Sequence, residues 1–428
     1  MAMRAGASAV EATCSQAQRF HVEARGTTLT KLERSAGRTL AMRMFAGGKR
    51  VMVSSSDLTV DGLERAIRSA VEQAAFVTED PFAVLPDACG AYGGNLALYD
   101  EALAARDDAA KIDDALALEA MIRETDSRIV NSNGSHYVDG ISTTALVTSG
   151  GFSGAYSGTR ATISSSPVAE DGQTKRVGHY GTASRAFAEL ESTRQVARFA
   201  AKRATEMFGA KKPPTARLPV IFERDVAAQV LDDIFAALSA ANAAVGNSWL
   251  ADRVGERIGS DLVTIVDDGT MPGKLGSSPF DGEGVPTRRT NVFTRGTLDT
   301  LLYDTYYARK LGATSTGNST GSGIGANNFY LAPGDVSLDA LIASTKRGVF
   351  VVDTIGFATE HATGTYSRGA RGFLIEDGEL RYPIEEFTVA GNFAEMLAAV
   401  DGVANDLRFD GSVVSPSFRV AEMTISGE

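Results

Sequence analysis

The chain has 428 residues, of which 43% are hydrophobic and 22% are charged, and its formal net charge at pH 7 is −11. At about 150 residues per domain, this length predicts two or three domains, each with a core of its own. The negative charge argues against binding to nucleic acids or anionic membranes through a general basic surface.

The first twenty residues and the cysteines predict a cytoplasmic protein. No apolar core follows Arg4 in the opening segment MAMRAGASAVEATCSQAQRF, so a secretory signal is not expected. No apolar run approaches the roughly 20 residues that cross a bilayer. The two cysteines, Cys14 and Cys89, are isolated, which fits a reducing compartment better than a disulfide framework.

The first hundred residues predict an α+β unit with three short strands. Strand-like runs occupy Phe20–Glu23, Thr39–Phe45 and Arg50–Ser54, and Gly47-Gly48 indicates a hairpin between the last two. Apolar residues at helical spacing then predict a helix over 63–74.

A second α+β unit follows and ends in a clear break. A helix is expected over Ala109–Thr125, and the alternating Ser/Thr/Gly-rich stretch from 130 to 166 predicts antiparallel strands with one wet face. A further helix over Glu189–Phe208 should end at Gly209, where a left-handed C-terminal cap belongs. The prolines in Lys211–Pro214 prevent its continuation.

The remaining half of the chain predicts a β-rich domain. Leu218–Phe222 is a short apolar strand, and Asp225 is placed to cap the helix after it. Short strands with Gly-based turns follow Gly246, which favours a closed or strongly curved sheet. Helical interruptions are expected at Leu301–Leu311, Leu338–Thr345 and Asn392–Gly402.

These elements predict an α+β fold, with N-terminal α/β units followed by a β-rich C-terminal domain whose sheet is strongly curved or barrel-like. The expected domains are an N-terminal α+β unit over 1–100, a central α+β unit with antiparallel strands over 101–212, and the β-rich domain over 213–428.

Histidine is scarce, and no pair of potential metal ligands is close in the sequence. The four histidines are His21, His136, His179 and His361, and neither H-E-x-x-H nor C-x-x-C occurs. A hydrolytic zinc site needs three protein ligands and an open position for water. The sequence therefore predicts neither the usual zinc site nor any other cofactor in this chain.

Four other motifs are compatible with chemistry but have structural alternatives. Ser319 matches the letters G-x-S-x-G, although its Gly/Ser/Thr-rich surroundings predict a loop and not a strand–turn–helix nucleophile. His361 follows a glutamate that could tune a general base, and a structural histidine is the alternative. Arg288-Arg289 could clamp a carboxylate or form a salt bridge within the sheet. Asp232 and Asp233 are adjacent on the expected helix, which favours a solvated face over a metal site.

Long segments of the sequence resemble the TldD/PmbA family over nearly the whole chain, from about residue 19 onward. EGVPTRRTNVFTRGTLDTLLYDTYYARKLGATSTGN, GTYSRGARGFLIEDGELRYPIEEFTVAGN and SPSFRVAEMTISG carry the resemblance, and DPFAVLPD resembles a signature at the end of the first unit. They lie at residues 283–318, 364–392, 415–427 and 80–87.

The resemblance points to one branch of that family. TldD-type members carry H-E-x-x-x-H on the helix that opens the C-terminal domain, and a late cysteine as a further zinc ligand. The matching helix here reads VLDDIFAALSAANAAVGNSWL, with Leu, Asp and Ala in place of the ligands, and 405–420 contains no cysteine. This is the pattern of the PmbA/TldE branch, whose members resemble a structural partner of a TldD-type zinc subunit.

The resemblance implies the non-zinc subunit of a cytoplasmic TldD–TldE-type metallopeptidase that processes peptides and degrades unfolded chains. This chain would form a chamber wall and hold peptide, would be inactive alone, and would rely on zinc bound by a TldD-like partner. The alternative is a self-associated homodimer that binds peptides without hydrolysing them. A peptidase acting alone through Ser319 or His361 is a weaker hypothesis, because no complete catalytic constellation is visible.

No catalytic, cofactor-binding or metal-binding residue is transferred from the family, because the matching positions lack the ligands. The expected rims of a peptide chamber are the loop at 312–328 and the turn at 363–371. The candidate peptide contacts on these segments and beside them are Arg288, Arg289, Asn318, Asn327, His361, Tyr366 and Arg368.

Overall fold

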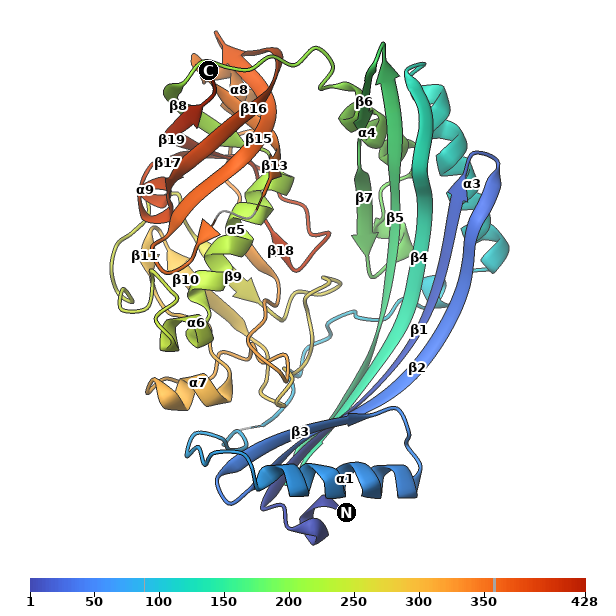
Figure 1. Ribbon diagram of the computed structural model, residues 1–428, viewed down its shortest axis with the longest axis vertical. Helices are drawn as coiled ribbons and strands as arrows, with labels where there is room; N and C mark the ends of the chain where they lie inside the picture. Colours follow the sequence, from blue (N-terminus) through green and yellow to red (C-terminus); the bar gives the residue numbers. More distant parts are fainter. Residues whose placement is uncertain (88, 357–358) are drawn as a thin grey trace.

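Long antiparallel strands form one curved sheet in the computed structural model, which describes residues 1–87, 89–356 and 359–428 (Figure 1). The sheet has the order β3-β2-β1-β4-β5-β6, and β7 pairs with β5. Its strands are β1 (Ala9–Arg25), β2 (Thr28–Ala46), β3 (Lys49–Ser55), β4 (Ile129–Thr148), β5 (Ser153–Asp171), β6 (Thr174–Val177) and β7 (Tyr180–Ser184). Because β1 pairs with β4, the two predicted N-terminal units contribute to the same sheet.

The predicted strands have the right positions but are too short. The run expected at Phe20–Glu23 is the end of β1, which begins at Ala9, and the expected hairpin joins β2 to β3 through Gly47 and Gly48. The middle of β1 has no buried residue on either face. Its sequence accordingly does not show the alternation of apolar and polar residues that predicts a strand. Pairing on both sides, with β2 and β4, keeps this polar segment extended.

Helices cover the sheet where its side chains are apolar. Helix α1 (Val60–Ala74) packs on Met42, Met44 and Val51 at one end of the sheet, as its predicted apolar stripe requires. Helices α3 (Asp108–Thr125) and α4 (Thr193–Thr205) pack on Phe20, Val22, Tyr137 and Ile163 at the other end. Side chains alternate along a strand, so the neighbours of these core residues lie on the face of the sheet that α3 and α4 leave uncovered.

The C-terminal half closes into a barrel, which confirms the predicted curved or barrel-like sheet. Strands β13, β8, β19, β16 and β15 pair in a ring, because β13 also pairs with β15, while β14 and β17 extend it. The barrel strands are β8 (Ala216–Phe222), β13 (Arg347–Ile355), β14 (Thr359–Glu360), β15 (Thr365–Glu376), β16 (Glu379–Asn392), β17 (Val400–Val403) and β19 (Phe418–Ser426).

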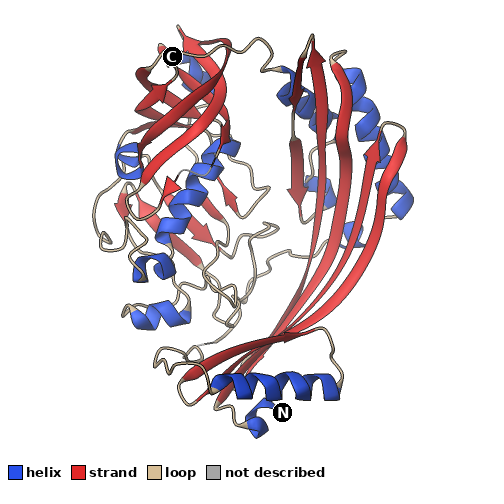
Figure 2. Ribbon diagram, in the orientation of Figure 1, coloured by secondary structure: helices blue, strands red, loops and turns tan. Residues whose placement is uncertain are grey.

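A second sheet of five strands lies beside the barrel, in the order β11-β10-β9-β12-β18. It consists of β9 (Ile265–Asp268), β10 (Arg289–Thr294), β11 (Thr297–Leu298), β12 (Phe329–Leu331) and β18 (Val413–Val414). Helix α5 (Arg224–Leu238) shares one core cluster with both sheets and packs Phe235 edge-on to Phe329. The described chain is therefore an α+β protein in which strands predominate (Figure 2).

Short helices occupy the predicted interruptions, although each is shorter than expected. They are α7 (Thr305–Lys310), α8 (Leu338–Ala343) and α9 (Phe393–Ala398), and α2 (Glu101–Ala104) and α6 (Ala240–Ala244) are further short helices. The predicted cap at Asp225 is wrong by two residues. Glu223 is the last extended residue before α5, and its side chain accepts a hydrogen bond from the backbone N–H of Asp225.

Charged pairs join the N-terminal sheet and its helices to the C-terminal domain. The Arg203 guanidinium of α4 lies 3.0 Å from the Glu223 carboxylate at the start of α5, and Arg176 on β6 binds Glu385 on β16 at 2.6 Å. Among the helices of the described residues, none is long and apolar enough to cross a membrane.

Candidate functional site

Helix α5 carries a carboxylate that is neutralised by an arginine of the barrel. The Asp233 carboxylate accepts hydrogen bonds from the guanidinium of Arg368 at 2.6 Å and from the Thr359 hydroxyl at 3.2 Å. Burial raises the pKa of Asp233, and the charge of Arg368 opposes that shift. The predicted solvated face is correct for Asp232, which is exposed, but wrong for Asp233, whose side chain is only 13% exposed.

The other residues predicted on or beside the 363–371 turn lie close to this ion pair, although Tyr366 and Arg368 belong to strand β15 and not to a turn. Tyr366 is fully buried, packs against Phe222 and Phe393, and lies 5.8 Å from the Arg368 guanidinium. Burial also raises the pKa of Asp232, and the nearby side chains of Arg368 and His361 oppose that shift. Glu360 accepts a hydrogen bond from Thr363.

These residues do not fit a hydrolytic zinc ion. Zinc is held by nitrogen, sulfur and carboxylate ligands, usually three in a catalytic site. On α5 the residues in the ligand positions implied by the resemblance are Leu231, Asp232 and Ala236, and Leu231 is part of the core. The nearby carboxylate of Asp233 is bound by a guanidinium, which supplies the positive charge that a metal would otherwise provide.

A cavity of about 480 Å³, lined by both polar and apolar side chains, lies where strands β1, β2 and β4 meet the loops of the C-terminal domain. The loop at 312–328, predicted as a chamber rim, lines it with Asn318, Ser319, Thr320, Gly321, Ser322, Gly325, Ala326 and Asn327. Glu11, Arg43 and Asp281 contribute charged side chains. His361 is not among the lining residues, so the structure does not bring it together with Ser319.

Two of the predicted contact residues, Asn318 and Asn327, bind a buried aspartate. The side-chain amides of Asn318 and Asn327 donate to the Asp267 carboxylate at 2.7 and 2.9 Å, and the backbone N–H of Asn327 donates at 2.8 Å. Burial raises the pKa of Asp267 to about 6, against the effect of these donors. Asp267 therefore anchors both ends of the 318–327 segment. Asp267 itself is the third residue of β9.

Asp281 is a buried carboxylate of this cavity, and no motif in the sequence pointed to it. Its carboxylate accepts hydrogen bonds from the backbone N–H groups of Glu283, Val285 and Ser319 at 2.9–3.0 Å. Burial, and then the negative charge of Glu283, raises the pKa of Asp281 to about 7. A carboxyl group with this pKa can exchange a proton with a bound molecule near neutral pH.

The two adjacent arginines do not form a clamp. Arg288 donates to the backbone carbonyl of Ser315 and so holds the 312–328 loop, whereas Arg289 on β10 is exposed and binds Asn291 at 2.6 Å. Arg288 therefore supports the loop, and Arg289 pairs with a neutral amide of its own strand, so neither contact is the predicted salt bridge.

The acidity of Asp281 predicts how stability depends on pH. The unfolded chain loses this proton near the ordinary pKa of 3.8, but the folded chain retains it up to about 7. Between these values the folded state binds more protons, so its stability should fall as the pH rises, by up to about 1.4 kcal/mol per pH unit. Urea unfolding at about pH 5 and about pH 7.5 measures the difference.

Asp281→Asn removes the titrating group, so the stability difference between the two pH values should become smaller. Asp61→Asn, on the exposed side of α1, is the matched control and should leave the difference unchanged. An equal pH dependence in wild type and Asp281→Asn would contradict the assignment.

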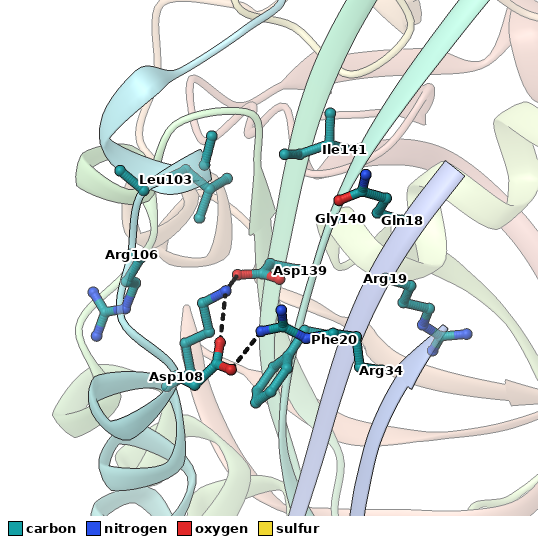
Figure 3. Close-up of a pocket in the computed structure, with 13 residues that line it drawn as sticks. Gln18, Arg19, Phe20, Arg34, Leu103, Arg106, Asp108, Asp139, Gly140 and Ile141 are labelled. Carbon is teal, nitrogen blue, oxygen red and sulfur yellow. Dashed lines mark hydrogen bonds and ion pairs between the residues drawn. The ribbon is translucent and has the colours of Figure 1, made fainter. Parts of the chain in front are cut away.

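A smaller charged cavity of about 250 Å³ lies between α3 and strands β1 and β4 (Figure 3). Lys111 binds Asp139 at 2.7 Å and lies 3.7 Å from Asp108, which also pairs with Arg34. Lys111 further lies 4.9 Å above the Phe20 ring. Because these charges are paired with one another, we interpret them as ion pairs that connect α3 to the sheet.

Comparisons with known proteins cover almost all of the chain. Residues 10–74, 101–208 and 215–427 match the family models for domain 1, the central domain and the C-terminal domain of the PmbA/TldA metallopeptidases. A relative from Haemophilus influenzae, named metalloprotease PmbA homolog, is 30% identical over 430 residues. The match spans 100% of this chain and 94% of the relative.

Solved structures have the same fold. A crystal structure from Bacteroides thetaiotaomicron is 27% identical, with a TM-score of 0.93 over 100% of this chain and 96% of that one. TldE from Thermococcus kodakarensis is 21% identical, with a TM-score of 0.90 over 100% and 98% of the two chains. At that identity the second match supports the fold alone.

Proposed function

Because the chain belongs to the PmbA/TldE branch of the PmbA/TldD metallopeptidase family, we propose that it is the subunit without the hydrolytic zinc in a TldD–TldE-type peptidase. The observation that carries this proposal is the composition of α5. Leu231, Asp232 and Ala236 replace the ligands of H-E-x-x-x-H, and the carboxylate of Asp233 is bound by Arg368. The catalytic zinc and the water that it activates would come from a TldD-like partner in the cytoplasm.

The role of this chain would be to form part of a chamber wall and to hold an extended peptide. The face of the large sheet that α3 and α4 leave uncovered supports this role. A hollow of about 610 Å³ along it is lined by residues of β1, β4 and β5, including Arg19 and Arg160. The backbone groups of these strands are already paired within the sheet, so the polar contacts to an extended peptide would come from side chains such as Arg19 and Arg160.

The proposal predicts a stable heterodimer. When the chain is co-expressed with a TldD-type protein, the two should elute together from size exclusion at about micromolar concentration, with one copy of each. The chain alone, at the same concentration, is the control. Separate elution of the two proteins would contradict the subunit proposal.

A self-associated peptide-binding protein is the alternative, and the same experiment tests it. Light scattering on the chain alone would then give a homodimer that persists when the TldD-type protein is added. Peptide binding without any change in the partner's cleavage would also favour this alternative.

A further inference from the structure

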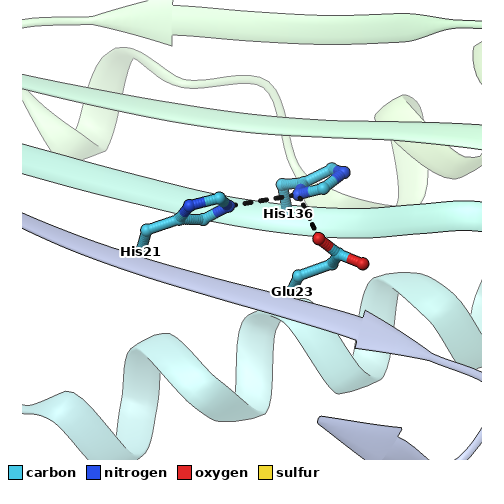
Figure 4. Close-up of side chains that lie close together, drawn as sticks. All are labelled: His21, Glu23 and His136. Carbon is cyan, nitrogen blue, oxygen red and sulfur yellow. Dashed lines mark hydrogen bonds and ion pairs between the residues drawn. The ribbon is translucent and has the colours of Figure 1, made fainter. Parts of the chain in front are cut away.

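Two histidines that are far apart in the sequence meet on the large sheet, beside a glutamate (Figure 4). His21 Nε2 lies 3.3 Å from His136 Nδ1, and the Glu23 carboxylate lies 3.9 Å from the same nitrogen of His136. Within the described residues, these three side chains are the group of His, Cys, Asp or Glu whose donor atoms lie near enough to share a metal ion. None of them belongs to α5 or to the cavity at the 312–328 loop.

The pairing of β1 with β4 produces this arrangement. Glu23 lies directly opposite His136 in the antiparallel register, and His21 is two residues before Glu23, on the same face. The residue between them, Val22, points into the core with Tyr137, under α3 and α4. The three polar side chains therefore project from the opposite face, where they are partly exposed and water can reach them.

The spacing of the ligand atoms suits a small tetrahedral ion. With zinc–nitrogen bonds of about 2.0–2.1 Å, two ligands of a tetrahedral ion lie about 3.3 Å apart. The two imidazole nitrogens already lie at this separation, where they share a hydrogen bond that a metal ion would replace. The Glu23 oxygen lies about 0.5 Å beyond this separation from His136, and the three ligand atoms lie within 4.8 Å of one another, so the carboxylate would move toward both histidines when an ion binds.

Neighbouring residues hold the ligands in place. The Thr30 hydroxyl donates to one oxygen of Glu23 at 2.7 Å and leaves the other oxygen facing His136. Gly134, at φ +119°, lies against both ligands, because a Cβ there would be 2.9 Å from Glu23 Cγ and 3.1 Å from His136 Nε2. It lies in an irregular stretch of β4, where the register with β5 shifts between Ser132 and Ser135. Such support is typical of metal ligands that are oriented by their surroundings.

We propose that His21, Glu23 and His136 form a binding site for a divalent transition metal of the zinc class, with a fourth position open to water or to a ligand. Two imidazoles and one carboxylate suit zinc and its neighbours better than magnesium or calcium, which prefer oxygen ligands. The site would clamp β1 to β4 and is separate from the zinc helix that the family resemblance implies for TldD-type chains. It also revises the expectation that this chain holds no metal.

The test is a titration of the purified, chelator-treated full-length chain with Zn²⁺ and with Co²⁺, followed by calorimetry, visible absorption and thermal unfolding. We expect one ion per chain, an absorption typical of four-coordinate Co²⁺ and a higher Tm with zinc. Loss of a residue that only hydrogen-bonds to a metal ligand typically weakens metal binding by about 10–100-fold. His21→Ala and His136→Ala, which remove ligands, should each weaken binding by more than that. Glu23→Gln should also weaken binding.

His179→Ala is the matched control, because His179 lies near His136 but binds Ser166 and is not one of the three ligands. It should keep the affinity of the wild type. Circular dichroism of the metal-free variants shows whether they fold. Equal affinity in wild type and in folded His136→Ala, or an equal loss in His179→Ala, would overturn the proposal. Neither result depends on a TldD-type partner, so this test is independent of the proposed function.

Discussion

Replacing Arg43 with methionine is expected to lower the free energy of unfolding by about 3–5 kcal/mol, because two buried carboxylates lose the guanidinium that binds them both. The Arg43 guanidinium binds Glu11 at 2.9 Å and Glu283 at 2.8 Å, and each of the three side chains is less than one-tenth exposed. Glu283 also accepts from the backbone N–H of Thr305, at the start of α7. The Arg43–Glu283 ion pair therefore joins the large sheet to the C-terminal domain.

Urea unfolding measures this effect, and Arg34→Met is the matched control. Arg34 pairs with Asp108 on the surface, so its loss should cost at most about 1 kcal/mol. Burial already raises the pKa of Glu11, and the Arg43 charge opposes that shift. Without Arg43 that pKa rises further, so the deficit should grow as the pH rises. If Arg43→Met lowers the free energy of unfolding no more than Arg34→Met does, the buried ion pairs of Arg43 do not stabilise the contact between the sheet and the C-terminal domain.

Arg368→Met should cost a similar amount, about 3–5 kcal/mol, because it leaves the carboxylate of Asp233 buried without its cation. The two side chains are 10% and 13% exposed, and their ion pair connects β15 to α5. The expected consequence is a less stable barrel. The measurement is urea unfolding near neutral pH, with far-UV circular dichroism as the probe.

Arg371→Met on the same strand is the control for this prediction. Arg371 lies 3.5 Å from Asp353 and both side chains are about one-third or more exposed, so its loss should cost at most about 1 kcal/mol. The double variant Asp233→Leu/Arg368→Met removes both charges and should recover most of the stability lost in Arg368→Met. If the double variant is no more stable than the single one, the buried charge is not the cause.

Two helices of the N-terminal half could be predicted from the local sequence, and α1 has a regular apolar stripe. The helices expected over 63–74 and 109–125 begin within three residues of the observed α1 and α3 and end at the same residues. The spacing of apolar residues on one face is a local signal, so no knowledge of the rest of the fold is needed. The hairpin at Gly47-Gly48 was predicted from a similarly local signal, because a glycine pair favours a tight turn. In the structure both glycines adopt positive φ angles.

The length of the strands could not be predicted in this way. In the middle of β1, both faces are polar and no helix covers them, so the strand depends on pairing with distant partners. The same holds for the buried carboxylates in and beside the cavity. Asp267 and Asp281 become unusual only when the C-terminal loops fold over them, and nothing in the neighbouring residues signals that burial.

The meeting of His21 and His136 illustrates this limit most clearly. They are 115 residues apart, and each looks isolated in the sequence. Only the register of β1 with β4 brings them onto one face, and register follows from pairing along the whole strand and not from a local motif. By contrast, the lack of H-E-x-x-x-H on α5 is a local property, and the sequence alone revealed it.

The most direct test of the central claim measures cleavage of unstructured peptides by the chain alone, by a TldD-type protein alone and by their mixture. The subunit account predicts that the chain alone is inactive, with or without added zinc, and that the mixture cleaves faster or at other positions than the TldD-type protein does. Cleavage by the chain alone, abolished by a chelator and restored by zinc, would contradict it. A mixture indistinguishable from the TldD-type protein alone would contradict it as well.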